Sequence, residues 1–255
     1  MNKFILLFIL FVLSSAGCTK LTTPTAGNYR ATIEIGGGTI PFELKVETKD
    51  GTPHLWLLQN SEAFAATDLR IKDHRLLATL PNGAGQLNAA IGQNSLEGEL
   101  QLTDPRGEVH QFPFRASLDS PYRFVAESST DNADVSGYWQ LSTSRTDPLS
   151  TPITLQLTQS FDAIDGKQIT ANSATPQYIY GQAHGDDIYL SALSAGQAWL
   201  FISHVNSQGN LEGKLWINSS DSLATEAIPM KEGIPDLENQ DELRQVGLPW
   251  AVPTR

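Results

Sequence analysis

Short runs of alternating apolar and polar residues dominate this sequence and constrain its fold more than any other feature. Every second side chain is apolar from Ile40 to Val46, and the pattern recurs over 96–102 and 112–118. A period of two places alternate side chains on opposite faces of a β-strand. Turn signals such as Asp50-Gly51 separate the runs, and no convincing helical stretch lies between them. This spacing predicts an all-β fold of antiparallel strands, arranged as a sandwich or a barrel.

The second half of the sequence repeats the first at an offset near 110 residues. The matches, in chain order, are Gly27–Ala31 with Gly137–Leu141; Phe42, Leu44 and Val46 with Ile153, Leu155 and Leu157; Leu77–Leu80 with Leu190–Leu193; Gly85-Gln86 with Gly196-Gln197; and Leu96–Gly98 with Leu211–Gly213. Such a period is too long for a solenoid repeat. Each copy is therefore predicted to be a complete domain of eight or nine strands, lipocalin-like in size. A barrel of that size is either filled by side chains or holds one small ligand.

The first eighteen residues have the composition of an export signal. Lys3 supplies one positive charge, and Phe4–Leu13 contains no polar side chain. Ten helical residues span roughly 15 Å, half of a ~30 Å hydrocarbon core, so this segment suits a signal peptide rather than a membrane span. Small residues then lead to Cys18, and together they resemble the lipobox of bacterial lipoproteins. Ser15 departs from that pattern, which usually has Leu or another apolar residue at its position.

The lipobox resemblance implies cleavage before Cys18 and acylation of its thiol and new amino terminus. The alternative is an ordinary secretory signal with a coincidental cysteine. Cys18 is the single cysteine of the sequence, so the lipidated chain would have no disulfide and no thiol redox centre. Acyl chains would hold the protein to the membrane. We expect a location in the cell envelope, facing the periplasm, at the outer membrane.

These features together predict the organisation of the chain. The expected segments are a lipoprotein signal peptide at 1–17, a lipidated linker at 18–26, a first β domain at 27–125, a polar linker at 126–134, a second β domain at 135–230 and a C-terminal tail at 231–255.

The negative charge of the chain limits the classes of partner that it is expected to bind. Its formal net charge is −11, and loss of residues 1–17 makes it −12, because Lys3 is the charged residue removed. An acidic surface repels nucleic acid and anionic lipid headgroups. We therefore expect no nucleic-acid partner, and contact with the membrane through the lipid anchor alone.

An ordered set of motifs resembles one known family. The motifs include Ile40–Leu44, Phe112–Ala116, Ser136–Trp139, Gly196–Phe201 and Leu211–Gly213. Over about residues 27–236 the chain resembles the region that precedes the thioredoxin domain in TlpA-type redoxin lipoproteins. In that family a Cys-x-x-Cys domain begins near a Pro-Asp-Leu segment. Pro235-Asp236-Leu237 is present here, but no second cysteine follows. The resemblance implies the fold and the periplasmic setting, without the redox activity of the family.

No motif in the sequence indicates a catalytic centre or a cofactor. The sequence lacks Gly-x-Ser-x-Gly, His-Glu-x-x-His and the Gly-rich nucleotide-binding loops. The five histidines are scattered without a metal-ligand spacing, so we expect no metal, no cofactor and no catalytic residue.

Two weaker candidate sites remain. The first is His184, Asp186 and Asp187, either a structural turn or a polar or cation site. The second is Trp216, which is out of phase with its apolar neighbours and suggests an interaction surface. Trp139 and Trp199 are expected in the core.

Two functional hypotheses follow, and the sequence does not choose between them. The first is a non-catalytic accessory or interaction module, paired with a separate periplasmic thiol-disulfide oxidoreductase. The alternative is a carrier that holds a small hydrophobic ligand in a barrel cavity. An apolar cavity of ~300 Å³ or more would favour the carrier.

Overall fold

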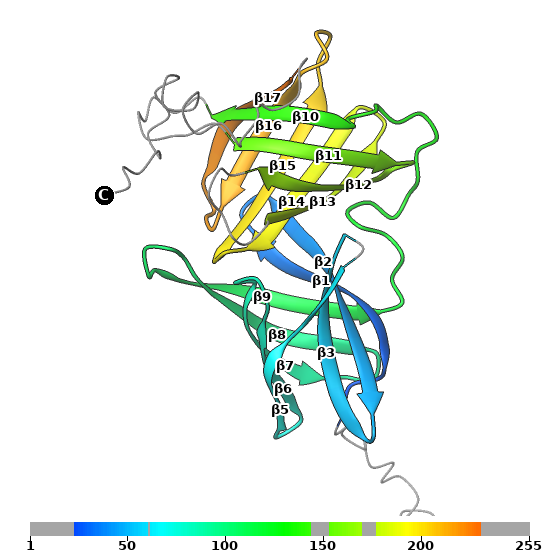
Figure 1. Ribbon diagram of the computed structural model, residues 1–255, viewed down its shortest axis with the longest axis vertical. Helices are drawn as coiled ribbons and strands as arrows, with labels where there is room; N and C mark the ends of the chain where they lie inside the picture. Colours follow the sequence, from blue (N-terminus) through cyan, green and yellow to red (C-terminus); the bar gives the residue numbers. More distant parts are fainter. Residues whose placement is uncertain (1–22, 61, 144–152, 170–176, 231–255) are drawn as a thin grey trace, which may run out of the picture.

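The computed structural model describes residues 23–60, 62–143, 153–169 and 177–230, and it consists of two β domains in tandem (Figure 1). The signal peptide, Cys18 and the tail at 231–255 lie outside the described residues. The predicted all-β fold with two antiparallel domains is confirmed, because every regular element in the described ranges is a strand. No helix in these ranges is long and apolar enough to cross a membrane.

Nine antiparallel strands form the first domain, in the spatial order β4-β3-β2-β1-β9-β8-β7-β6-β5. They are β1 (Gly27–Ile35), β2 (Gly38–Lys49), β3 (Thr52–Gln59), β4 (Glu62–Ala65), β5 (Thr67–Lys72), β6 (Arg75–Leu80), β7 (Gly85–Ile91), β8 (Ser95–Thr103) and β9 (Val109–Leu118). The sheet curls into a nearly closed barrel whose two edge strands, β4 and β5, are neighbours in the chain.

The second domain is a closed barrel of eight antiparallel strands in chain order, with β17 paired to β10. Its strands are β10 (Gly137–Thr143), β11 (Ile153–Ser160), β12 (Ala163–Ile169), β13 (Gln177–His184), β14 (Asp187–Ser194), β15 (Gln197–Val205), β16 (Leu211–Ile217) and β17 (Ser222–Pro229).

The strand registers of the two domains match along β1 and β10. Tyr29 lies opposite Leu44, and Trp139 lies opposite Leu155. The Tyr29 hydroxyl donates to the carbonyl of Thr25, four residues earlier, at 2.8 Å. The Trp139 indole donates to the carbonyl of Val135, also four residues earlier, at 2.8 Å. Two different aromatic residues thus make the same contact at equivalent positions.

Gly98 and Gly213 occupy a second pair of equivalent positions. Gly98 lies opposite Ala89, and Gly213 opposite Ser203. A Cβ atom on either glycine would overlap a backbone carbonyl oxygen of the neighbouring strand. The close approach of two strands therefore requires glycine in both domains.

The structure corrects two of the predicted repeat matches in the β-hairpins that follow. Leu190 packs in the core of the second domain, whereas Leu77 is only partly buried, between the inward-facing Leu76 and Ala78. The match of Leu77 with Leu190 is therefore wrong by one residue. The β6–β7 loop has four residues and the β14–β15 turn has two, so Gly85 and Gly196 are not equivalent either.

The expected inward-facing residues form the cores. Those that are buried are Phe42, Leu44, Val46, Phe112, Phe114, Leu155 and Leu157, together with Trp139 and Trp199. The repeat matches Ile153 with the buried Phe42, but at the first described position of β11 Ile153 is only partly buried and packs against the edge of the core. Alternation fixes the face that a side chain occupies, while the end of a strand lowers its burial.

Candidate functional site

The interface between the two domains combines apolar packing with hydrogen bonds. Three side chains from the outer face of β14 and β15 (Leu193, Ala198 and Leu200) are buried in the hydrophobic core of the first domain. Trp216 packs there as well, and a Cβ atom on Gly37 would overlap its indole ring. The structure therefore places Trp216, the expected interaction residue, in a contact within this chain.

The β14–β15 turn is held between two loops of the first domain. The amide of Ala195 donates to the carbonyl of Asn82 at 2.7 Å, and that of Gly196 donates to Gly83 at 2.9 Å. On the other side, a Cβ atom on Gly196 would overlap the carbonyl oxygen of Thr103 at the end of β8. Glycine at 196, which has a φ of 73°, is thus required both by its backbone and by its neighbours.

Side chains of β13 reach carboxylates of the first domain. The Tyr180 hydroxyl donates to Glu43 at 2.7 Å, and the Tyr178 hydroxyl donates to Glu62 at 3.0 Å. Burial, followed by the nearby Glu43 carboxylate, raises the pKa of Tyr180 well above its ordinary value. The phenol therefore stays protonated and acts as the donor at neutral pH.

The segment between β9 and β10 is tied to the second barrel. Arg123 donates to the carbonyls of Ile164 and Gly181 at 2.6 and 3.0 Å, and pairs with Asp165 at 2.8 Å. Its guanidinium also lies over the Tyr180 ring, 4.1 Å from the centroid. These directed contacts, together with the apolar core, fix the two domains against each other.

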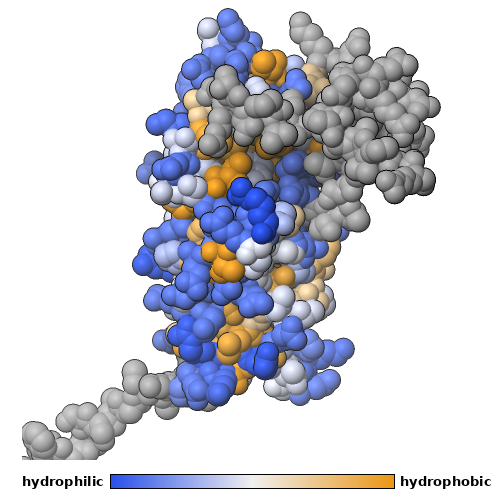
Figure 2. All heavy atoms as spheres, turned by 90° about the vertical axis from the view of Figure 1, so that its left-hand side faces the viewer, coloured by the Kyte–Doolittle hydropathy of each residue, from blue (hydrophilic) through white to orange (hydrophobic). Residues whose placement is uncertain are grey.

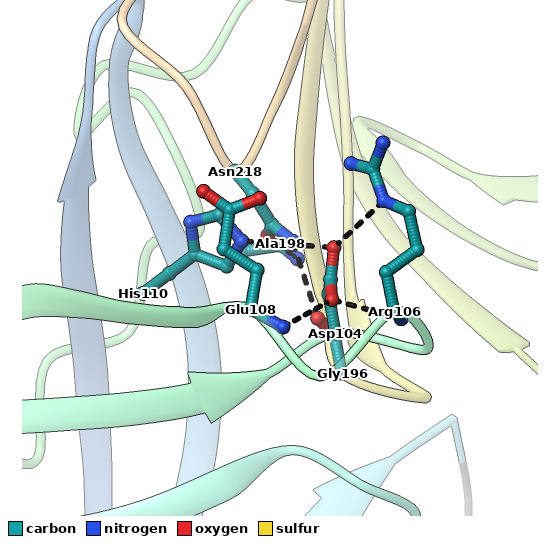
Figure 3. Close-up of polar contacts among 7 residues, drawn as sticks. All are labelled: Asp104, Arg106, Glu108, His110, Gly196, Ala198 and Asn218. Carbon is teal, nitrogen blue, oxygen red and sulfur yellow. Dashed lines mark hydrogen bonds and ion pairs between the residues drawn. The ribbon is translucent and has the colours of Figure 1, made fainter.

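A polar group centred on Asp104 lies at one edge of this interface (Figure 3). Asp104 follows β8, and its Oδ1 accepts hydrogen bonds from the amides of Arg106 and Glu108 at 2.9 and 2.8 Å. Its Oδ2 lies 3.3 Å from Nε of Arg106. Burial acts to raise the pKa of Asp104, but these hydrogen bonds outweigh it and hold the pKa below its ordinary value. Asp104 is therefore a buried carboxylate that stays ionised.

Glu108 and His110 join Asp104 at this edge. The possible ligand atoms of the three side chains all lie within 4.8 Å of one another. They line an open pocket of about 580 Å³, which Gln197, Asn218 and Ser219 complete from the second domain. Two hydrogen bonds hold the Asn218 side chain in this part of the pocket. It accepts one from the amide of Ala198 at 2.7 Å and donates one to the carbonyl of Gly196 at 3.2 Å (Figure 3).

The sequence predicts no metal site, and no motif in it points to these three residues. Their only sequence signal is the spacing Asp104-x-x-x-Glu108-x-His110 around a turn. In the described residues they are the one group of three acidic or histidine side chains whose possible ligand atoms converge.

The expected group at His184, Asp186 and Asp187 does not converge in this way. These residues lie at the β13–β14 turn, where Asp187 faces His204 with 3.0 Å between Oδ1 and Nδ1. The carbonyl of Asp186 accepts from the amide of Val205 at 2.9 Å. The turn also contacts the interdomain linker, since the amide of Gly185 donates to Asn132 at 2.8 Å. These contacts are those of a structural turn, which ties β13 and β14 to the neighbouring chain.

One face of the molecule is mainly hydrophilic (Figure 2). Figure 2 shows one face on which hydrophobic residues gather only in small groups between polar ones. The large hydrophobic side chains exposed in the described ranges are Val109, Tyr122, Phe161 and Ile228.

Comparison with known proteins gives little further information. No family model matches this chain, and no curated protein matches it. Among solved structures, it is similar to the crystal structure of a protein of unknown function from the DUF3598 family of Nostoc punctiforme. The identity is 12%, over 80% of this chain and 94% of that chain, with a TM-score of 0.27. A similarity of this size supports no conclusion about activity.

Proposed function

We propose that this protein is a lipid-anchored, non-catalytic component of the cell envelope that serves as an interaction module for a separate periplasmic thiol-disulfide oxidoreductase. The resemblance to the TlpA-type lipoproteins supplies the kind of partner. The lipobox supplies the anchor and the expected position at the outer membrane. The observation that carries the proposal is the end of the first domain at which the described chain begins, relative to the second barrel.

The chain enters the first domain at the end far from the second barrel (Figure 1). Thr25 donates to the carbonyl of Gln93 in the β7–β8 loop, at this far end. The loops β1–β2, β6–β7 and β8–β9 lie at the opposite end and contact the second barrel. Cys18 precedes Gly27 by nine positions, which is a reach of at most about 30 Å. A lipid on Cys18 would therefore keep the first domain beside the membrane and point the barrel outward.

The interior of the second barrel favours the module over the carrier. Trp139, Trp199 and Phe201 are buried there with the surrounding leucines and isoleucines. Two large pockets lined by described residues of the second domain open to solvent, and their linings are mainly polar. A carrier would need an apolar cavity instead.

The anchor is tested by fractionating cells that express Cys18→Ala. This variant should leave the membrane fraction or accumulate as precursor, because acylation requires the thiol. Ser15→Leu, which restores the usual lipobox residue, is the matched control and should remain in the membrane. An unmodified mature chain that starts at another residue would contradict the proposal.

The module is tested by cross-linking in intact cells followed by capture of the lipidated protein. A periplasmic protein with a Cys-x-x-Cys motif should be enriched, and its yield should fall in Cys18→Ala. Organic extraction of the same purified protein tests the carrier. One equivalent of a hydrophobic molecule would favour that alternative and count against the module.

A further inference from the structure

We propose that Asp104, Glu108 and His110 form a binding site for a divalent transition-metal cation of the Zn²⁺ type. The site lies in the pocket between the two domains, and the inference does not depend on the proposed partner.

The first observation is an unsatisfied imidazole nitrogen. The Nε2 atom of His110 is inaccessible to solvent and has no hydrogen-bond partner. Its nearest charged neighbour is Oδ2 of Asp104 at 3.9 Å, which is too long for a hydrogen bond. A buried polar atom without a partner is uncommon in a folded protein, and an ion is one of its recognised explanations.

The second observation is that the distance between His110 Nε2 and Asp104 Oδ2 suits a bound cation. Zinc bonds of about 2.0–2.1 Å in tetrahedral geometry place two ligand atoms about 3.4 Å apart. The 3.9 Å between His110 and Asp104 must therefore shorten by roughly half an ångström. Glu108 is exposed, so its carboxylate is free to close the third side.

Two of the three ligands are already held in position. The amides of Arg106 and Glu108 orient the Asp104 carboxylate. The His110 ring stacks on Phe112, with 6.4 Å between centroids and 24° between planes. Such preorganisation is what a metal site requires of the residues around it.

Arg106 is the cation already present near Asp104, but it does not block the site. Its side chain is 84% exposed, and its contact with Asp104 is a single 3.3 Å approach. A single long contact from an exposed guanidinium contributes little to stability. A divalent ion would therefore displace the guanidinium while Asp104 kept its two amide hydrogen bonds.

The donor set selects the class of cation. One imidazole nitrogen and two carboxylates suit Zn²⁺ and related transition metals, whereas Mg²⁺ and Ca²⁺ prefer oxygen ligands alone. A fourth ligand position would face the pocket, where water or a side chain of the second domain can enter. Because the turn that carries Asp104 packs on Gly196, a bound ion would also stiffen the interface.

The test is calorimetric titration of Zn²⁺ into the full mature chain, purified in detergent without a histidine tag. One equivalent should bind, and His110→Ala and Glu108→Gln should each weaken the affinity at least tenfold. His204→Ala is the matched control, because His204 pairs with Asp187 but belongs to no group of three converging ligand atoms among the described residues. It should bind as the wild type does.

A thermal melt of each variant accompanies the titration. Zn²⁺ should raise the Tm of the wild type and of His204→Ala, since it binds the folded state. It should raise the Tm of His110→Ala much less, although that variant should melt cooperatively without metal. The proposal is overturned if the wild type binds no Zn²⁺, if both site variants keep wild-type affinity, or if His204→Ala loses the bound ion.

Discussion

The two domains have the same order of paired strands, but they differ at the fourth strand. In the second domain, β13 is continuous and pairs with β12 on one side and β14 on the other, so the barrel closes. In the first domain, the same path is divided into β4, which pairs with β3, and β5, which pairs with β6. The register shifts between Thr67 and Arg70, and Asp68 has a φ of 52°. A local irregularity of this kind bends a strand and ends its pairing.

The difference shows how an open barrel can be stabilised by its neighbour. The short edge strand β4 is a potential site for unwanted pairing. Here the Phe64 ring contacts Tyr178 with 5.7 Å between centroids, and Glu62 accepts the Tyr178 hydrogen bond. The closed second barrel thus contacts the edge strand β4 through Phe64 and Glu62, while the other two residues of β4 are exposed.

The largest expected effect comes from a core position at which the two domains differ. Phe114 and Thr225 occupy equivalent positions, opposite Gly98 and Gly213 respectively. Phe114→Ala should lower the free energy of unfolding by roughly 3–5 kcal/mol, because it removes a fully buried aromatic ring. Thr225→Ala should cost only about 1 kcal/mol, since it removes far less buried volume. Urea denaturation followed by circular dichroism measures both.

Arg115 is the control for this comparison, because it lies on the outer face next to Phe114. Arg115→Ala should change the stability by no more than about 0.5 kcal/mol, despite an exposed ion pair with Glu34. Equal losses from Phe114→Ala and Arg115→Ala would mean that the strand faces are wrongly assigned.

An intermediate effect is expected at the paired glycines. Gly98→Ala and Gly213→Ala should each destabilise by roughly 1–3 kcal/mol, because the added Cβ overlaps a backbone carbonyl that cannot easily move. The two losses should be similar if the domains are structural duplicates. Differential scanning calorimetry gives both values, with Glu97→Ala on the exposed face as the control. A large loss at one glycine and none at the other would break the equivalence.

The smallest expected effect tests the contact between the domains. Tyr180→Phe removes the hydrogen bond to Glu43 and should cost roughly 0.5–1.5 kcal/mol at pH 8. Because the pKa of Tyr180 is raised in the folded protein, its contribution is fully present below about pH 10, the pKa of an unfolded tyrosine, and is lost as the pH rises further.

The measurement is the difference in urea stability between wild type and Tyr180→Phe at pH 8 and at pH 11. This difference should shrink at pH 11. A difference that stays constant with pH would mean that the pKa of Tyr180 is the same in the folded and unfolded states.

The cores of both domains were readable from the sequence because burial follows strand alternation. Phe42, Leu44, Leu155 and Leu157 were placed correctly for this reason, and so was the equivalence of Gly98 with Gly213. The repeat failed at β6 and β14, where a one-residue error matched Leu77 with Leu190. Loops of different length separate those strands from the next match, and local sequence does not fix the register across a loop.

The Asp104 group was not found because nothing in its local sequence distinguishes it from an ordinary polar turn. Its three side chains converge only through the β8–β9 hairpin, and the pocket exists only because Asn218 and Ser219 arrive from a second domain. The position of Trp216 has the same explanation. Its phase indicated that it faces away from its own barrel, but Gly37, which covers it, lies far away in the sequence.

The sequence by itself determined the strand faces and the duplication, because each depends on the order of neighbouring residues. It also predicts the signal peptide and the lipobox from local order. The tertiary structure decided which barrel closes, how the domains meet and which polar side chains share a pocket. These depend on contacts between residues far apart in the chain, where packing and backbone hydrogen bonding select one arrangement among many that satisfy the same local pattern.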